Sequence, residues 1–243
     1  MGDYPVDHHH FRHPQWRSLP DLHFYPVPSF NVPLGVMIPQ EADDLIVAEK
    51  SVSVSNLING ATRLQPVVMQ LGQAAGALAA LAVTEGKRVK EVGVRQVQEA
   101  LLNAGCYIMP YLDLLPGDPH FLAVQRIGAT GILRGKGMNV GWANQTWFRI
   151  GDPLMWEEIH TDGYFHGSLT ARKGEVTVGE MIGVIKGTGG AVPSDIGTWW
   201  ETLGLTDYRT DRAATRLEAA VVIDAAIDPF SRFEVNYDGD VKM

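Results

Sequence analysis

A cluster of side chains able to hold charge and move protons stands close to the beginning of the chain. It consists of His8, His9, His10, Arg12 and His13. Imidazole titrates near neutral pH and a guanidinium keeps its charge, so such a set can polarise a substrate or transfer a proton. A polar surface loop is the plainest alternative. A metal site is a third, but adjacent side chains on an extended chain point to opposite faces, so we expect no metal.

A second stretch places polar residues directly in front of an apolar helix. It reads NGATRLQPVVMQLGQAAG at residues 59–76, and Pro66 stands where a first helical turn accepts proline. The free N–H groups and the positive end of the dipole at such a helix start favour a ligand oxygen. Gly60 would let a flat ring approach the backbone, and Arg63 would supply a permanent cation. A tightly packed structural helix with a surface arginine explains these residues equally well.

The composition excludes several classes of function. The chain has 243 residues, of which 45% are hydrophobic and 20% charged, as in soluble globular proteins. Its net charge of -8 argues against nucleic acid as a partner, because phosphate binding needs clustered Lys and Arg. Cys106 is the only cysteine, which excludes an internal disulfide and a cysteine-based metal site. The first residues contain no apolar segment typical of a signal peptide, and the compartment stays open.

The apolar run over residues 66–83 approaches the length of a membrane span. It contains Gln70 and Gln73 and is rich in glycine and alanine. We therefore expect a buried helix of a soluble domain and no membrane span.

The elements that must position these residues follow from the breakers and the periodicity. Residues 1–40 contain seven prolines and no helical period, which predicts loops and short extended pieces. The order predicted after them is an extended piece at 31–38, a buried strand at 44–50, a serine-rich loop at 51–60, a helix from 66 to about 84 closed by Gly86, and a helix at 94–104.

The sequence pattern changes to short, strongly capped helices after a segment at 107–117 that contains two prolines. Beyond it, helix starts are predicted at Asp118-Pro119 and Asp152-Pro153, capping boxes at Thr177 with Glu180 and at Thr215 with Glu218, and a short helix at 198–203. We therefore place one domain over residues 1–110 and a mainly α-helical domain over residues 111–243.

Residues 43–83, DDLIVAEKSVSVSNLINGATRLQPVVMQLGQAAGALAALAV, resemble the C-terminal flavin-binding segment of FAD-dependent oxidoreductases related to fumarate reductase flavoproteins. The features that correspond are a strand at 45–50, a serine-rich loop at 51–55, an Arg-x-x-Pro step at 63–66 and a Gly-x-Ala-Ala-Gly helix at 72–76. The stretches GDYPVDHHH at 2–10 and FNVPLGVMIP at 30–39 resemble a bacterial branch of the same family. The resemblance covers about residues 1–110.

The resemblance implies an α/β flavoprotein segment, which is a partial FAD-binding domain, followed by the mainly α-helical domain. It implies FAD as cofactor, hydride transfer through flavin N5 and a small-molecule substrate. The helix start at Pro66 would face the pyrimidine edge of the flavin. The cofactor-binding residues expected are Ser55, Asn59, Gly60, Ala61, Arg63, Gln65 and Pro66. The substrate-facing, catalytic residues expected are His8, His9, His10 and Arg12.

One departure from the family pattern concerns the ADP half of the cofactor. Such proteins bind it with an N-terminal G-x-G-x-x-G between a strand and a helix, and this chain contains no such motif. We therefore expect the chain to be the C-terminal portion of a longer flavoprotein. Its partner would be a missing N-terminal FAD-binding region or a separate chain carrying one.

Three pieces of the C-terminal half resemble the S-layer-homology type of module. They are DPHFLAVQRIGATGILRGKG at 118–137, NQTWFRIGDPLMWEEI at 144–159 and TRLEAAVVIDAAI at 215–227. Such modules bind cell-wall polysaccharide, whereas a plain packing domain is the simpler reading. The alternative functions for the chain are therefore a carbohydrate-binding or wall-anchoring module, or a polysaccharide-active protein of the lyase type.

Overall fold

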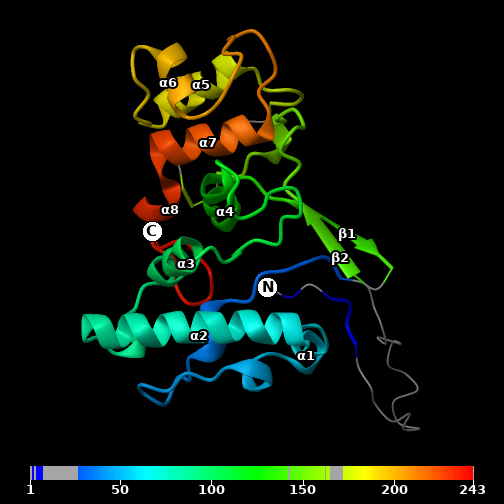
Figure 1. The fold of residues 1–243 in the computed structure, drawn as a ribbon, viewed down its shortest axis with the longest axis vertical. Helices are drawn as coiled ribbons and strands as arrows, with labels where there is room; N and C mark the ends of the chain where they lie inside the picture. The colour runs from blue at the N-terminus through cyan, green and yellow to red at the C-terminus, as the bar shows by residue number, and fades with distance from the viewer. Residues whose placement is uncertain are drawn as a thin grey trace. The chain divides into compact units, whose positions relative to one another are not determined.

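The computed structural model describes residues 2, 4–7, 27–141, 143–161, 163–164 and 172–242 (Figure 1). These residues are mostly helical, with one two-stranded hairpin. The chain divides into two compact units. Unit 1 comprises Met1–Ala104, Gly137–Thr146 and Tyr237–Gly239, and unit 2 comprises Gly105–Lys136, Trp147–Asn236 and Asp240–Met243.

Unit 1 is built around one long helix. Its elements are two 3-10 helices at Leu34–Met37 and Glu49–Ser51, α1 (Asn56–Thr62), α2 (Gln65–Glu85), a 3-10 helix at Val89–Glu91, α3 (Val94–Asn103), and most of the hairpin of β1 (Lys136–Val140) and β2 (Ala143–Trp147). Helix α3 packs along α2, as Figure 1 shows. The core beneath them is aliphatic, with Leu78 and Val97 in one cluster and Met37 and Leu71 in another.

The two helices predicted in this unit are confirmed. Pro66 lies in the first turn of α2, and Gly86 ends the helix in the left-handed region at φ 61°. Glycine is favoured there because it has no Cβ to clash. The second helix ends at Asn103, and Gly105 adopts φ 74° two residues later.

The strand predicted over residues 44–50 is wrong, and so is the extended piece over 31–38. Residues 27–110 contain no β-strand, so the α/β character expected of this segment is not present among the described residues. Val47 N–H donates to the Met37 carbonyl at 2.8 Å, but Glu49–Ser51 turns into a 3-10 helix immediately afterwards. A strand needs a ladder of several such bonds, and among the described residues this is the one backbone bond of residues 44–50 to another segment.

The segment predicted to be extended over residues 31–38 bends where its backbone comes close to Tyr237. Gly35 N–H donates to the Tyr237 carbonyl at 3.0 Å, and a Cβ at position 35 would lie 2.8 Å from that oxygen. Residues Leu34–Met37 form a 3-10 helix around this contact. Tertiary contact therefore overrides the extended preference of FNVPLGVMIP.

Helix α2 was expected to be buried, and this expectation is wrong. Of its 21 residues only Val67, Leu71, Leu78 and Ala82 are buried. Among the described residues it is the one helix whose length and mean hydropathy, 1.6, suffice to cross a membrane, and 22% of that window is buried. Its core-facing residues recur every three or four positions, so the described elements cover one side of the helix only.

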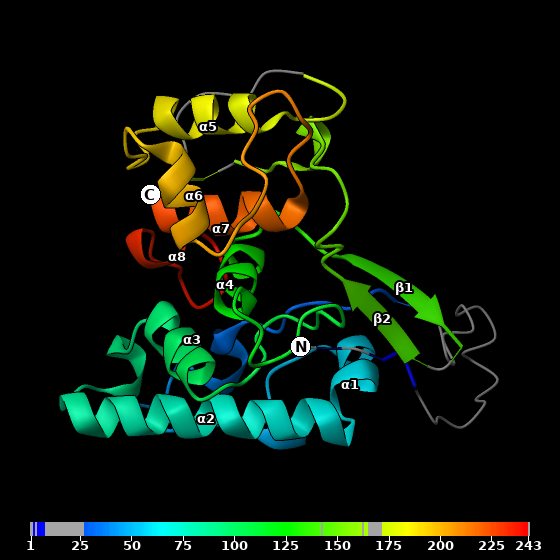
Figure 2. The same cartoon turned by 45° about the horizontal axis from the view of Figure 1, so that its top comes forward.

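Unit 2 is a helical body centred on α7. Its elements are α4 (Phe121–Thr130), a 3-10 helix at Trp156–Glu158, α5 (Val178–Gly187), α6 (Ile196–Thr202), α7 (Arg216–Ile227) and α8 (Pro229–Arg232). Helix α7 contacts α4, α5 and α8, and it lies between α4 and α5 in both views (Figure 2). Nine of its 12 residues are buried; seven of these are apolar, and the other two, Arg216 and Glu218, are ion-paired.

Both capping boxes predicted in this unit are confirmed. Thr177 Oγ1 accepts from Glu180 N–H, and Thr215 Oγ1 accepts from Glu218 N–H, each at 3.2 Å. In return, the carboxylates of Glu180 and Glu218 accept from the backbone N–H groups of Thr177 and Thr215 at 3.0 and 2.7 Å. The short helix predicted at 198–203 is also present, as α6.

The helix predicted from Asp118-Pro119 to near Gly131 is confirmed as α4, with a later start, whereas the helix start predicted at Asp152-Pro153 is wrong. Helix α4 begins only at Phe121, because the Asp118 carboxylate accepts from Leu115 N–H at 2.6 Å and so closes the preceding turn. Asp152-Pro153 starts no α-helix. Leu154 bonds the Ala214 carbonyl at 2.7 Å and accepts from Val176 N–H at 2.9 Å, which holds this segment extended.

An acidic pair on α7 and at the start of α8 shares one arginine from α4. Arg126 Nε lies 3.0 Å from Asp224 Oδ1, and its Nη2 bonds Asp228 Oδ1 and, at 3.0 Å, Ser231 Oγ. Burial raises the pKa of Asp224 to about 6, since it outweighs the opposing charge of Arg126, and Asp228 adds to the rise. The folded protein therefore binds more protons than the unfolded chain between about pH 4 and pH 6.

We expect this carboxyl group to make the free energy of unfolding fall as pH rises through that window. In Asp224→Asn this contribution is absent. The free energy of unfolding of the variant, relative to that of the wild type, should therefore rise by about 2–3 kcal/mol from pH 4 to pH 7. Urea unfolding at a series of pH values measures the difference. Asp207→Asn is the control of opposite sign, because a hydrogen bond from Arg209 lowers the pKa of Asp207. A constant difference between Asp224→Asn and wild type at all pH values would contradict the expectation.

Candidate functional site

The segment expected to hold the cofactor folds as the short helix α1, a two-residue corner of Arg63 and Leu64, and the long helix α2. Ser55 is the N-cap of α1, and its Oγ accepts from Ile58 N–H at 3.3 Å. The loop predicted to run through residue 60 therefore ends at Ser55. Asn59 and Gly60 lie inside α1, where Asn59 N–H donates to the Ser55 carbonyl at 2.9 Å. Gly60 has no positive φ, so a turn does not require glycine there.

The last turn of α1 is buried. Gly60, Ala61 and Thr62 are inaccessible, and Thr62 Oγ1 donates to the Ile58 carbonyl at 3.2 Å. The Gly60 carbonyl accepts from Asp7 N–H at 3.3 Å, which ties the N-terminal segment to α1. Gly60 was predicted to let a flat ring approach its backbone, but its carbonyl makes an internal contact in this chain.

Arg63 lies at the corner between α1 and α2. It is the C-cap of α1, and its side chain, 34% exposed, reaches back to the N-terminal segment. Nη2 donates to the Asp7 carbonyl at 2.7 Å and lies 3.5 Å from Asp7 Oδ2. The pairing of Arg63 with Asp7 was not predicted from the sequence, because 56 positions separate them and no local signal links the two.

The first turn of α2 has no side-chain cap. Leu64 occupies the N-cap position without a side-chain bond, no acidic residue follows in the first turn, and Gln65 and Pro66 are exposed. The N–H groups of a first turn have no partner within the helix and carry the positive end of its dipole. Pro66 has no N–H and Val68 N–H donates to the Leu64 carbonyl at 3.0 Å, so among the described residues the start of α2 leaves the N–H groups of Gln65 and Val67 as its free donors, beside the Arg63 guanidinium.

Two polar atoms of the expected cofactor residues are buried without a hydrogen-bond partner among the described residues. They are Asn59 Oδ1 and Arg63 Nε. Buried polar atoms are normally paired, since an unpaired one costs about 1–3 kcal/mol. Both belong to the corner between α1 and α2, where one donor and one acceptor are left over.

The expected catalytic residues His8, His9, His10 and Arg12 lie outside the described residues. Their arrangement around Asp7 and Arg63 stays a prediction. Among the residues that the structure does describe, no group of three or more metal-binding side chains comes together.

An exposed stripe runs along α2 on the side away from its core-facing residues. We call it the α2 stripe, and it consists of Met69, Gly72, Gln73, Gly76, Ala79, Ala80 and Val83, all exposed. Met69 is 71% and Val83 82% exposed, and a Cβ added at Gly72 or Gly76 would have open space around it. Apolar surface of this extent on a soluble protein usually marks an interaction site.

Comparison with known proteins bears on the same segment. Residues 1–101 match the family model described as FAD dependent oxidoreductase. No curated protein and no solved structure matches the chain. The matched region of this FAD-dependent oxidoreductase family contains all seven expected cofactor residues and all four expected catalytic residues. Residues 102–243 are unassigned, including the pieces that resemble S-layer modules.

The match supports the coarse part of the sequence interpretation. Residues 1–101, fewer than half of the 243, are similar to part of an FAD-dependent oxidoreductase domain, and that family implies FAD as the cofactor. It assigns neither a substrate nor a role to any single residue.

Proposed function

We propose that the chain is the C-terminal portion of an FAD-dependent oxidoreductase and completes the flavin pocket for hydride transfer on a small substrate. The observation that carries this proposal is α2, whose start is an uncapped set of donors and whose outer face is uncovered. A helix of 21 residues with 22% of its apolar window buried needs another polypeptide against it in a water-soluble enzyme. A flavin domain of the matched family would cover that face and meet the donors.

The donors present at the corner fit the cofactor. The pyrimidine edge of a flavin presents N1 and the C2 carbonyl oxygen, which accept hydrogen bonds and gain negative charge on reduction. The N–H groups of the first turn of α2 and the unpaired Arg63 Nε are matching donors. The buried Asn59 Oδ1 is an acceptor, suited to a ring N–H. Asp7 already neutralises part of the Arg63 charge, so the effect of this cation is moderated.

The remaining expected residues take supporting roles in this proposal. FAD, when bound, supplies two-electron hydride chemistry at N5. Ser55 fixes the start of α1, Ala61 packs its last turn, and Gln65 and Pro66 form the exposed edge of the α2 start. His8, His9, His10 and Arg12 would face the substrate, polarise it and hold or move its proton.

The partner in this proposal is a missing N-terminal FAD-binding region or a separate chain that carries one. The support is the absence of G-x-G-x-x-G from this sequence, together with the uncovered α2 stripe. If this chain alone retained one FAD per molecule through gel filtration, the proposed need for a partner would be overturned.

The second candidate function belongs to residues 111–243, as a carbohydrate-binding or wall-anchoring module or part of a polysaccharide-active protein. The observation in its favour is the recurrence of capping-box helices, α5 and α7, in the order typical of S-layer modules. A pull-down with purified cell-wall polysaccharide tests it. A yellow complete protein with a flavin absorption band but no polysaccharide binding would favour the oxidoreductase alone.

The residue-level test concerns Arg63 in the complete flavoprotein. We expect Arg63→Gln to lower the flavin midpoint potential by tens of millivolts, because a cation near the pyrimidine edge stabilises the anionic reduced ring. A charge at a helix end is worth about 0.3–2 kcal/mol, and about 30 mV corresponds to 1.4 kcal/mol in a two-electron couple. Spectroelectrochemical titration measures the shift.

Arg88→Gln is the matched control, since Arg88 is exposed and paired with Glu91 away from the corner. It removes the same charge and should leave the potential unchanged. If Arg63→Gln keeps the wild-type potential and flavin content, Arg63 has only the structural role seen in its bonds to Asp7.

A further inference from the structure

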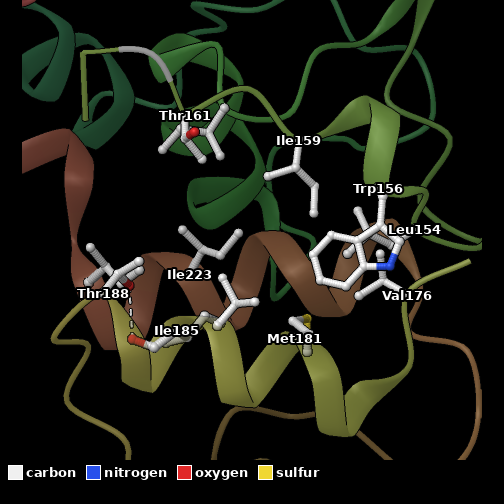
Figure 3. A pocket seen from close by; sticks show the side chains of 12 residues that line it. Leu154, Trp156, Ile159, Thr161, Val176, Met181, Ile185, Thr188 and Ile223 are labelled. Carbon is white, nitrogen blue, oxygen red and sulfur yellow. Dashed lines mark hydrogen bonds between the residues drawn. The ribbon is translucent and has the colours of Figure 1, made fainter. Parts of the chain in front are cut away.

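Unit 2 contains an apolar cavity of about 50 Å³ between α5, α7 and residues 154–161 (Figure 3). Trp156 and Met181 line one end of it, and Thr161 and Thr188 line the other. Every other lining side chain is aliphatic. The six-membered ring of Trp156 faces the cavity and its nitrogen lies on the far side. A polar group placed deep in the cavity would therefore lose its hydrogen bonds with water and gain none.

The burial of the lining residues separates a floor from a mouth. Leu154 and Val176 are fully buried at the floor. The half-buried lining residues, which form the mouth, are Ile159, Thr161, Val184 and Thr188. An occupant consequently enters with a hydrocarbon end first and keeps any polar end beside the two threonines.

The threonine hydroxyls set the chemistry of that polar end. Thr188 Oγ1 donates to the Ile185 carbonyl at 2.9 Å, so its hydroxyl is left as an acceptor. It therefore favours a ligand group that donates a hydrogen bond. Thr161 adds a hydroxyl able to donate or accept. Among the described residues no ionisable side chain lines the cavity, so they offer a charged head no counter-ion.

The size of the cavity limits the hydrocarbon end. A single water needs about 10–15 Å³ of such space, so the cavity holds about four groups of that size. This corresponds to an alkyl end of about four carbon atoms.

The surroundings of the mouth favour a small molecule over a protein surface. Among the described residues, the large apolar side chains that are exposed lie elsewhere, and none belongs to α5, α7 or residues 154–161. A docking protein would need an apolar rim around the mouth, and these elements do not offer one.

We propose that this cavity is a binding site for a small uncharged amphiphile with an alkyl end of about four carbons and a hydroxyl-type donor at its head. The alkyl end fills the space between Trp156 and Met181, and the head donates to Thr188 Oγ1. The site is independent of the flavin function, because all its residues belong to unit 2.

The test uses the full chain labelled with ¹³C at its methionine methyl groups, titrated with the straight-chain alcohols from ethanol to 1-hexanol. The Met181 signal, identified from Met181→Leu, should shift and saturate. Affinity should rise about fourfold with each added methylene, the equivalent of about 0.8 kcal/mol, and level off near four or five carbons. Shifts of equal size at all 8 methionines, or shifts without saturation, would overturn the proposal.

Two variants on α5 sharpen the result. Val184→Phe should fill the mouth and weaken 1-butanol binding at least tenfold. Gly183→Ala adds a methyl group where nothing lies within 4 Å and should leave binding unchanged. Equal affinity in both variants would contradict the proposed site.

A third variant covers the case in which Val184→Phe does not melt cooperatively. Thr188→Val keeps the shape of the mouth and removes the acceptor. It should weaken 1-butanol severalfold while leaving xenon binding unchanged. Unchanged butanol affinity in Thr188→Val would remove the role of this hydroxyl and overturn the assigned head-group chemistry.

Discussion

Replacing Arg216 with alanine is expected to lower the melting temperature of unit 2 by roughly 10 °C. A buried acceptor that loses its donor costs about 1–3 kcal/mol, so the loss of two carbonyl bonds and the weakening of one ion pair should amount to about 3–5 kcal/mol. Each 1 kcal/mol shifts the melting temperature by about 2–4 °C in a chain of this size. Thermal unfolding followed by circular dichroism of the full chain measures the shift.

The contacts of Arg216 explain why the loss should be so large. The side chain is 2% exposed, and its guanidinium donates to the carbonyls of Phe148 at 2.7 Å and Arg134 at 2.6 Å. Its Nη1 lies 2.6 Å from Glu158 Oε2. Burial favours a raised pKa for Glu158, but Lys136 and Arg216 together bring that pKa below its usual value. In Arg216→Ala the buried carbonyls of Phe148 and Arg134 would therefore lose their donor. The Glu158 carboxylate would lose one of its two neighbouring cations and keep Lys136.

Arg209→Ala is the control for this prediction. Arg209 also pairs with an aspartate, Asp207, but both side chains are about 60% exposed. Exposed pairs contribute little, since water and salt screen them, so the melting temperature should stay unchanged. Similar shifts in Arg209→Ala and Arg216→Ala would mean that the buried network is not what stabilises unit 2.

Helices with local signals were predictable from this sequence, and elements that depend on distant segments were not. The threonine–glutamate pairs that begin α5 and α7, and Gly86 after α2, act within a few residues of the ends they define. The β1–β2 hairpin carries no such signal. All five residues of β1 are exposed, so no buried apolar face marks this short segment as a strand.

In the candidate site, too, features set by neighbouring residues were predictable and contacts with distant segments were not. The helix start at Pro66 and its lack of a charged first turn could be predicted, because they depend on neighbouring residues. The pairing of Arg63 with Asp7 could not, since it joins segments 56 positions apart. The apolar residues of 44–50 indicated a buried strand, but a strand forms only where another segment supplies a ladder. The same limit applies to burial of α2, which depends on what lies outside its own sequence.

A single glutamate on the α2 stripe is expected to prevent assembly of the flavoprotein while leaving the chain itself folded. Gly76 lies at the centre of the stripe, and a Cβ there has open space around it, so Gly76→Glu fits the chain without strain. Glutamate also favours a helix more than glycine does, by roughly 0.5–1 kcal/mol. The melting temperature of the chain alone should therefore stay the same or rise.

The cost arises only when another polypeptide covers the stripe. A carboxylate buried there would meet no cation among the exposed residues of the stripe, which are Met69, Gly72, Gln73, Ala79, Ala80 and Val83 besides Gly76 itself. Burying an unpaired charge costs several kcal/mol, and each 1.4 kcal/mol is a factor of ten in association. We expect assembly to weaken at least a hundredfold, seen as flavin absorbance lost from the protein peak in gel filtration.

Asn103→Glu adds the same charge to unit 1 at an exposed position outside the stripe and outside the matched residues 1–101, and it should keep full flavin content. The pair of variants separates coverage of α2 from a general effect of charge. If Gly76→Glu retains flavin as the wild type does, the stripe faces water in the complete protein, and the proposed completion of a flavin pocket loses the observation that carries it. If it loses flavin and also melts early on its own, the stripe supports the internal packing of unit 1 instead.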